Sequence, residues 1–107
     1  MEFMTPLQLA GRLAADDDTA VQLLDVREPW ELDVCVLPGV VAIPMQQIPH
    51  RIHELSAAVL TVCICHHGAR SLEVARYLSQ HGIEKVANLE GGMDAWARTV
   101  DPDLAVY

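Results

Sequence analysis

Short apolar segments that alternate with stretches of helical character constrain the fold of this chain most strongly. Four such segments stand out: residues 21–26 (VQLLDV), 40–43 (VVAI), 58–65 (AVLTVCIC) and 85–89 (KVANL). Their apolar residues run on continuously instead of alternating with polar ones, which is typical of strands buried on both faces. Strands of this kind separated by helices predict an α/β fold, a parallel sheet flanked by helices on both faces.

Helices are expected between these strands. Thr5 is a suitable N-cap and Pro6 suits the first turn, and apolar residues then recur at helical spacing. Pro29 is placed to open a second, short helix. Further helices are expected over residues 49–55, 71–80 and 93–99.

Length and charge limit what the chain can be. Its 107 residues predict one domain, residues 1–107, with a core over about 5–99 and a loose tail over 101–107. A net charge of −8 argues against nucleic acid and anionic membranes as partners, and the acidic run Asp16 to Asp18 is expected to be a solvated loop. No apolar run reaches the ~20 residues of a membrane span, and no secretory signal is indicated, so a cytoplasmic location is expected.

The three cysteines are expected to be free thiols. An odd number cannot form a closed disulfide framework, and Cys63 and Cys65, on the same face of one strand, do not easily reach disulfide geometry. Cys63, in mid-strand, and Cys35 are expected to be mostly buried. A zinc site is not expected, because there is no CxxC pair and His66 and His67 are adjacent in a tight loop.

Cys65 differs from the other two cysteines because it opens a polar segment, CHHGARS, at the carboxyl end of the most apolar strand. Sites in parallel sheets lie at that end of the strands. The amides of a loop between strand and helix form an anion-binding nest, and the helix N-terminus adds roughly half an elementary charge. Gly68 allows a sharp turn, and Arg70 adds a full positive charge. Such surroundings stabilise a thiolate, the reactive form of cysteine, so we favour a reactive thiol over a small buried hydrophobe.

The chain also resembles a known family. Four segments, in order, are similar to signatures of the rhodanese family: LLDVREPWEL (23–32), LPGVVAIP (37–44), VCICHHGARS (62–71) and NLEGGMDAWA (88–97). The resemblance extends over roughly residues 5–99 and implies a five-stranded parallel sheet flanked by helices on both faces. One departure is Val36, which stands where many relatives carry a histidine.

The resemblance implies sulfurtransferase chemistry without a metal or organic cofactor. Sulfane sulfur would pass from thiosulfate or a persulfide donor, either a small anion or a donor protein, through a persulfide on Cys65, to a thiol, cyanide or an acceptor protein. Arg70 would help to dock the donor, and Asp25 and Arg27 are expected to support the loop through an ion pair. Ser71 is expected first of all to cap a helix, and Trp30 and Trp96 to serve packing. The loop expected to bind the sulfur substituent comprises His66, His67, Gly68, Ala69, Arg70 and Ser71.

Three other functions stay open, one of them a redox sensor in which Cys65 is oxidised to sulfenic acid. Many rhodanese-like domains lack the cysteine and serve as binding or regulatory modules, whereas this chain keeps Cys65. Cysteine phosphatases and arsenate reductases use a similar thiolate, but their loop is longer. Only four residues, 66–69, separate Cys65 from Arg70, and the smaller ring of amides suits a sulfur substituent better than a phosphoryl group. The physiological donor and acceptor and the oligomeric state are left open.

Overall fold

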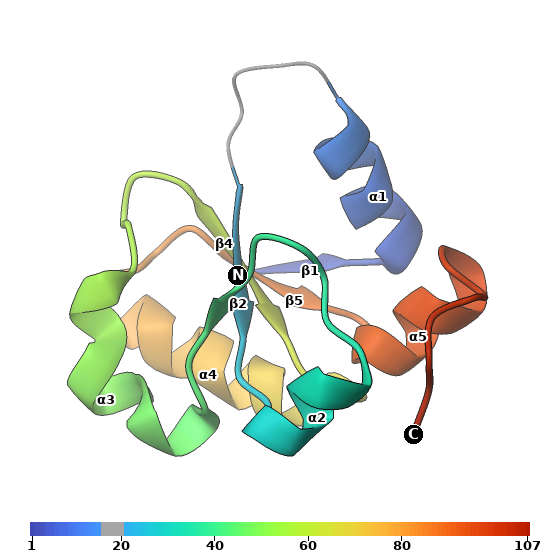
Figure 1. The fold of residues 1–107 in the computed structure, drawn as a ribbon. Helices are drawn as coiled ribbons and strands as arrows, with labels where there is room; N and C mark the ends of the chain where they lie inside the picture. Colours follow the sequence, from blue (N-terminus) through green and yellow to red (C-terminus); the bar gives the residue numbers. More distant parts are fainter. Residues whose placement is uncertain (16–20) are drawn as a thin grey trace.

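Five parallel strands form one sheet in this computed structural model, which describes residues 1–15 and 21–107 (Figure 1). The strand order is β1-β5-β4-β2-β3, and every neighbouring pair is parallel, as the sequence predicts. The acidic run Asp16 to Asp18 lies outside the described residues. The strands are β1 (Glu2–Met4), β2 (Val21–Asp25), β3 (Val41–Ala42), β4 (Leu60–Ile64) and β5 (Val86–Leu89).

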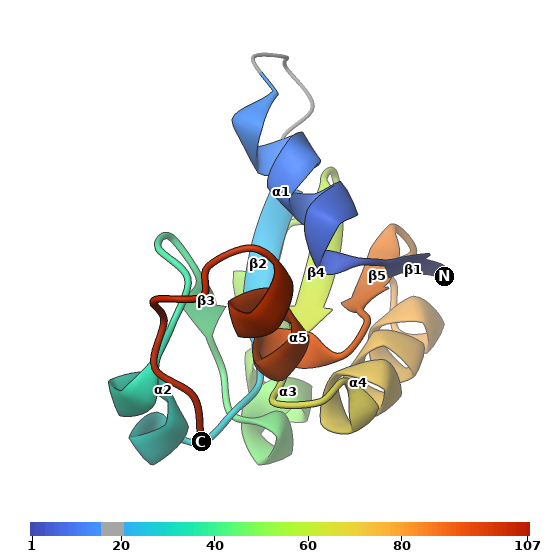
Figure 2. The ribbon, with the colours of Figure 1, turned by 90° about the vertical axis from the view of Figure 1, so that its right-hand side faces the viewer.

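Helices cover both faces of the sheet. Helices α1 and α5 pack on one face and α3 and α4 on the other (Figure 2). The first helix begins as predicted, because the Thr5 side chain accepts a hydrogen bond from the Gln8 amide and the Gln8 side chain accepts one from the Thr5 amide. The helices are α1 (Pro6–Ala14), α2 (Pro29–Val34), α3 (Ile48–Arg51), α4 (Ala69–Gln80) and α5 (Gly92–Thr99).

Residues 49–55 and the first strand differ from the sequence predictions. The helix expected over residues 49–55 is a single α-helical turn, α3, between the 3₁₀ turns η1 (Met45–Gln47) and η2 (Ile52–Glu54), because the backbone at Arg51 (φ −121°) leaves α geometry. Strand β1 was not predicted from periodicity. Three residues are too few to show a pattern, and pairing with β5 alone makes them a strand.

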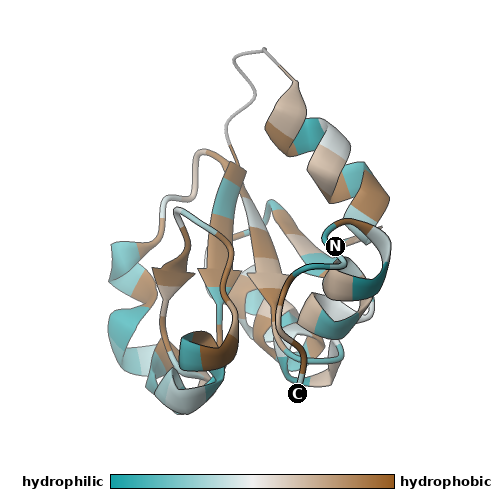
Figure 3. Cartoon of the chain, turned by 45° about the vertical axis from the view of Figure 1, so that its right-hand side comes forward, coloured by the Kyte–Doolittle hydropathy of each residue, from teal (hydrophilic) through white to brown (hydrophobic). Residues whose placement is uncertain are grey.

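Strand β4 is central, and all five of its residues are buried. Val62 and Ile64 contact the layer of α1 and α5, whereas Cys63 faces the layer of α3 and α4. Figure 3 shows the strands dominated by apolar residues and the helices carrying both kinds. This placement puts the carboxyl end of β4 between two helical layers. Among the described residues, no helix has the length and hydropathy to cross a membrane.

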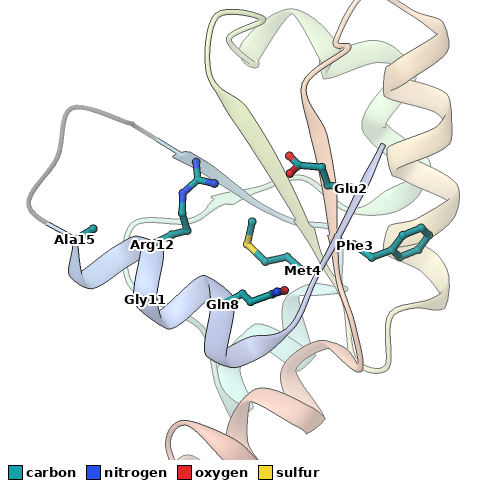
Figure 4. A pocket seen from close by; sticks show the side chains of 7 residues that line it. All are labelled: Glu2, Phe3, Met4, Gln8, Gly11, Arg12 and Ala15. Carbon is teal, nitrogen blue, oxygen red and sulfur yellow. The ribbon is translucent and has the colours of Figure 1, made fainter.

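A hollow of about 420 Å³ lies between β1 and α1 (Figure 4). None of its lining residues belongs to the segment that follows β4, so this hollow is separate from the predicted site. The lining residues are Glu2, Phe3, Met4, Gln8, Gly11, Arg12 and Ala15.

Candidate active site

Cys65 lies directly after β4, at the carboxyl end of the central strand, as predicted. Only 1% of its surface is exposed. The Gly68 amide donates a hydrogen bond to Cys65 Sγ (3.0 Å), and Ser71 Oγ lies 3.3 Å from the same sulfur. The amides of Ala69, Arg70 and Ser71 are in the first turn of α4, where amides have no acceptor within the helix. The sulfur is therefore buried, but among hydrogen-bond donors.

The start of α4 corrects the expectation for Ser71. The helix begins at Ala69, and its N-cap is Gly68, in the left-handed conformation (φ 102°), without a side-chain cap. The prediction that Ser71 caps the helix is wrong. Its fully buried hydroxyl contacts both Cys65 Sγ and Asn88 Oδ1, and since it has one proton it can donate to only one of them at a time.

Asn88, at the end of β5, is a site residue that sequence reasoning missed. Its Nδ2 atom donates to the Gly68 carbonyl oxygen (3.1 Å), and its Oδ1 atom meets the Ser71 hydroxyl. Asn88 thus ties two parts of the loop to the neighbouring strand. The available signal was a polar residue within an otherwise apolar strand, which is buried here because its amide is hydrogen-bonded.

The first turn of α5, which begins at Gly92, holds the loop from the other side. The Met93 amide donates to the Cys65 carbonyl oxygen (2.9 Å), and the Asp94 amide donates to that of His66 (3.1 Å). Gly92 has a positive φ of 58°, and a Cβ atom there would overlap both carbonyl groups. The close approach of α5 to the Cys65 loop therefore requires glycine at this position.

Arg70 is paired with a glutamate in the structure. Its guanidinium donates two hydrogen bonds to the Glu31 carboxylate (2.8 and 2.7 Å). The bond from Arg70 lowers the pKa of Glu31 to about 2, and the same pairing raises the pKa of Arg70. Glu31 was missed; its side chain also accepts a hydrogen bond from the Glu28 amide (2.8 Å), which fixes it at the start of α2.

Asp25 and Arg27 form the expected ion pair, and both side chains are fully buried. Arg27 Nη2 lies 2.8 Å from Asp25 Oδ2 and 2.7 Å from the Cys35 carbonyl oxygen. Burial alone would lower the pKa of Arg27, but hydrogen bonds with Asp25 and Tyr107 outweigh it and raise the pKa above its usual value. The pair joins the end of β2 to α2, which carries Glu31.

The tail over residues 101–107, which the sequence predicts to be loose, contributes Tyr107 to the site. Its ring stacks on His66 (centroids 4.0 Å apart), and its hydroxyl donates to Glu31 Oε1 while accepting from Arg27 Nη1, each at 2.9 Å. Burial raises the pKa of Tyr107 to about 12. The chain end lies beside α2 in Figures 1 and 2. No local pattern announces Tyr107, because all these partners are distant in sequence.

The two tryptophans differ. Trp96 is 6% exposed and packs in the core, as predicted. Trp30 is 60% exposed, and its ring packs edge-to-face with the ring of Tyr107, with the centroids 5.5 Å apart. Trp30 therefore lies on the surface beside the site instead of filling the interior.

The two histidines of the loop stack on each other, with ring centroids 4.0 Å apart, and His66 lies against Tyr107 as well. Burial, and then the proximity of His67, lower the pKa of His66. A lowered pKa favours the uncharged ring, so His66 contributes less positive charge to the loop than an ordinary histidine would.

All three cysteines are free thiols, and each is buried. Cys63 lies on the same side of the sheet as Cys65, as predicted, and Cys35 lies on the other side. Burial raises the pKa of Cys63 to about 12, so this thiol stays protonated at neutral pH. Of the described cysteines, Cys65 alone has its sulfur at the start of a helix.

A parallel sheet whose central strand runs into a cysteine and a tight loop before a helix is the architecture of a rhodanese-like α/β domain. The family model for the Rhodanese-like domain matches residues 5–99, and the chain belongs to this family, which confirms the resemblance seen in the sequence.

Relatives and solved structures agree with this assignment. A sulfurtransferase from Allochromatium vinosum is 41% identical over 97 residues, which cover 91% of this chain and 89% of that protein. The thiosulfate sulfurtransferase GlpE from Pseudoalteromonas translucida is 30% identical over 84% of this chain and 86% of its own length. A crystal structure of a rhodanese-like domain protein from Staphylococcus aureus is 32% identical with a TM-score of 0.84, covering 100% of this chain and 99% of that one. In two other curated relatives, the chain spans only 30% and 47% of the length.

Proposed function

We propose that this chain is a sulfurtransferase in which Cys65 carries sulfane sulfur as a persulfide. The family and its relatives support sulfur transfer in general. The observation that carries the proposal is the pair of hydrogen-bonding groups at the sulfur, the Gly68 amide and the Ser71 hydroxyl. Hydrogen bonds to a charged acceptor are stronger than those to a neutral one, so this pair favours an anion at Sγ.

The proposed reaction has two steps. The Cys65 thiolate attacks the outer sulfur of thiosulfate, a sulfur–sulfur bond to Sγ forms, and the bond to the sulfonyl sulfur breaks as sulfite leaves with the electron pair. The persulfide then gives its outer sulfur to a thiolate or to cyanide, and the electron pair of the broken bond returns to Sγ. Charge balances in both steps, and neither step needs an oxidant or a reductant.

The loop has the groups to hold the persulfide. The outer sulfur carries the negative charge, and the first-turn amides of Ala69, Arg70 and Ser71 are placed at the N-terminus of α4, where anions are stabilised. The candidate substrate-binding set is the full loop of His66 through Ser71, with Cys65 as the nucleophile. Asp25 and Arg27 act on this site through Cys35, Tyr107 and Glu31, and so serve as positioning residues.

Access to the sulfur requires movement. Cys65 is 1% exposed, and Arg70, the residue expected to dock an anionic donor, is occupied by Glu31. We propose that the anionic donor competes with the Glu31 carboxylate for Arg70 and that the Arg70 side chain, about one third exposed, swings to bring the donor to the loop. Acceptors are a small thiol, cyanide or a protein thiol, and three free cysteines fit a reducing, cytoplasmic setting.

Intact-mass analysis after treatment with thiosulfate tests the proposal. We expect the wild type to gain one sulfur atom that cyanide removes, and the Cys65→Ser variant to gain none. The Cys63→Ala variant is the matched control, because it removes a neighbouring buried thiol and should still gain the sulfur. A persulfide on Cys63, or no cyanide-labile sulfur on the wild type, would contradict the proposal.

A binding module is the second candidate, and the burial of Cys65 together with the Glu31–Arg70 pair favours it. A docking domain needs no open path to the sulfur. It predicts that Cys65→Ser retains the cellular function of the chain and that the wild type forms no persulfide. Turnover of a phosphate ester, in contrast, would point to a cysteine phosphatase.

A further inference from the structure

Two histidines and an aspartate converge beside the Cys65 loop. His66 and His67 belong to the loop, and Asp94 lies in the first turn of α5. One ligand atom from each of the three side chains lies within 4.8 Å of the other two. The backbone fixes part of this arrangement, because the Asp94 amide donates to the His66 carbonyl oxygen (3.1 Å).

His66 carries an unusual feature for a buried polar atom. Its Nδ1 atom is buried and has no hydrogen-bond partner within the part of the chain that the structure describes. Buried polar atoms in proteins nearly always have a partner, so this nitrogen calls for an explanation. The ring is stacked between His67 and Tyr107 and so cannot turn freely to find a partner elsewhere.

We propose that His66, His67 and Asp94 form a binding site for one divalent transition-metal ion of the zinc type. Imidazole nitrogens and a carboxylate are ligands that Zn²⁺ accepts, whereas Ca²⁺ and Mg²⁺ prefer oxygen ligands throughout. Sequence spacing argued against zinc because the two histidines are adjacent. The third ligand comes from α5, 27 positions further along the chain than His67, and only the fold brings it near.

The geometry requires a modest adjustment. Tetrahedral coordination with bonds of about 2.0–2.1 Å places ligand atoms about 3.4 Å apart. In the structure the three ligand atoms are separated by up to 4.8 Å, so they must move closer together. The rings of His66 and His67 are stacked and nearly parallel (20°), so both cannot direct a nitrogen lone pair at one ion until His67 leaves the stack. His67 is exposed and Asp94 is partly exposed, so rotations of these two side chains can bring the ligand atoms together without moving the core. Three protein ligands leave the fourth position for water or another small ligand.

Arg98 competes for the same carboxylate. Its guanidinium lies 3.0 Å from Asp94 Oδ2 and 3.4 Å from Oδ1. The Arg98 side chain is 71% exposed, so it can leave the carboxylate at little cost. Removing Arg98 should therefore strengthen metal binding, which is a prediction opposite in sign to removal of a ligand.

An ion at this site would cross-link the Cys65 loop to α5, because its ligands come from both. Cys65 is 1% exposed, so a sulfur donor must displace groups of the surrounding loop, and an ion that joins His66 and His67 to α5 makes that loop harder to displace. We therefore expect Zn²⁺ to slow sulfur transfer. This consequence rests on the proposed function, whereas occupancy of the site does not.

Calorimetric titration of the reduced chain with ZnCl₂ tests the site directly. We expect one ion to bind to the wild type, with affinity reduced at least about tenfold in His67→Ala and Asp94→Asn and increased in Arg98→Ala. His53→Ala, which removes an exposed histidine elsewhere, and Cys65→Ser should bind like the wild type. Thermal melts verify that each variant folds. We expect His53→Ala and His67→Ala to fold normally, because both side chains are exposed.

The absorption spectrum of bound Co²⁺ distinguishes histidine and carboxylate ligands from cysteine ligands. Co²⁺ bound to thiolate has an intense near-ultraviolet band that Co²⁺ with nitrogen and oxygen ligands lacks. We expect visible bands of tetrahedral Co²⁺ without that band, in both the wild type and Cys65→Ser. No binding to the wild type, unchanged affinity in both ligand variants, or loss of binding in Cys65→Ser would overturn the site. If the ion binds as expected but the chain forms no persulfide, the metal site stands and the proposed function fails.

Discussion

Cys63, in β4, and Cys65, directly after it, lie on the same side of the sheet, yet their surroundings differ in a way that bears on their chemistry. Both are shut from solvent, with 0% and 1% of their surfaces exposed. Around Cys63, burial raises the thiol pKa to about 12. At Cys65, one residue beyond the end of β4, the Gly68 amide and the Ser71 hydroxyl reach the sulfur. Burial alone therefore does not identify an inert thiol, and the hydrogen-bonding groups around the sulfur make the difference.

The largest effect on the sulfur-transfer rate should come from substitution of one of the two cysteines. Cys65→Ser should lower the sulfur-transfer rate by about 10³-fold or more, because the proposed nucleophile is lost. Cys63→Ala should leave the rate within about threefold and cost about 1 kcal/mol in unfolding free energy, since it opens a small space in the core. Rates with thiosulfate and cyanide, together with urea denaturation, measure both. Equal loss of activity in the two variants would contradict the proposal that only Cys65 carries the sulfur.

The next largest effect should come from the glycine that lets α5 approach Cys65. Gly92→Ala should cost more than about 3 kcal/mol in unfolding free energy, because the new Cβ atom overlaps the carbonyl groups of Cys65 and His66. Gly39→Ala is the matched control, since Gly39 also has a positive φ (79°) but no atom of the described residues lies within 4 Å of a Cβ there.

Urea denaturation separates the two contributions. Gly39→Ala should cost about 1 kcal/mol, the strain of a left-handed alanine alone. An equally small cost for Gly92→Ala would mean that α5 does not hold the Cys65 loop as closely as the structure shows.

A smaller effect is expected when the sulfur loses one donor. Ser71→Ala removes the hydroxyl next to Cys65 Sγ and keeps the Gly68 amide, so sulfur transfer should fall about tenfold, as expected for one hydrogen bond to a charged group. The rate of Cys65 alkylation by iodoacetamide should fall in parallel. Ser79→Ala, an exposed serine on the same helix, is the control and should change neither rate. Alkylation that proceeds unchanged in Ser71→Ala would show that the hydroxyl does not stabilise the thiolate.

The smallest effect concerns the ion pair beside Cys65. The folded-state pKa of Glu31 is about 2, below its ordinary value of 4.5, so the carboxylate contributes stability above pH 4.5. This stability is lost as the pH falls from 4.5 towards 2, because the unfolded chain binds the proton first. Since Arg70 is one third exposed, we expect a contribution of only about 1 kcal/mol after solvent screening.

Denaturation of Glu31→Gln between pH 7 and pH 3 measures that contribution. The variant should be less stable than the wild type at pH 7, and the difference should shrink as the solution becomes acidic. Glu54→Gln, which breaks the exposed pair with Arg51, is the control and should show a smaller pH-dependent difference. A constant difference at all pH values would assign the effect of Glu31→Gln to packing.

Much of the fold could be predicted from the sequence. The apolar runs indicated β2, β4 and β5 because a strand buried on both faces needs apolar residues throughout. Strand β1 could not be predicted this way, since three residues show no period and the strand exists only through pairing with β5. Part of the candidate site could likewise be predicted from the sequence and part could not. The segment CHHGARS pointed to Cys65 and its loop, but Glu31, Asn88 and Tyr107 lie far from it in the chain.

The sequence by itself determined the class of fold, the position of the cysteine that we propose to be reactive, and the order of the segments around it. These follow from local rules, because strand burial, glycine turns and helix starts depend on neighbours along the chain. Only the tertiary structure decided that Arg70 pairs with Glu31, that Ser71 contacts the sulfur instead of capping its helix, and that Asp94 lies beside two histidines. The physical reason is that a side chain interacts with whatever charge or donor folding brings within a few ångströms, and sequence distance does not set that separation.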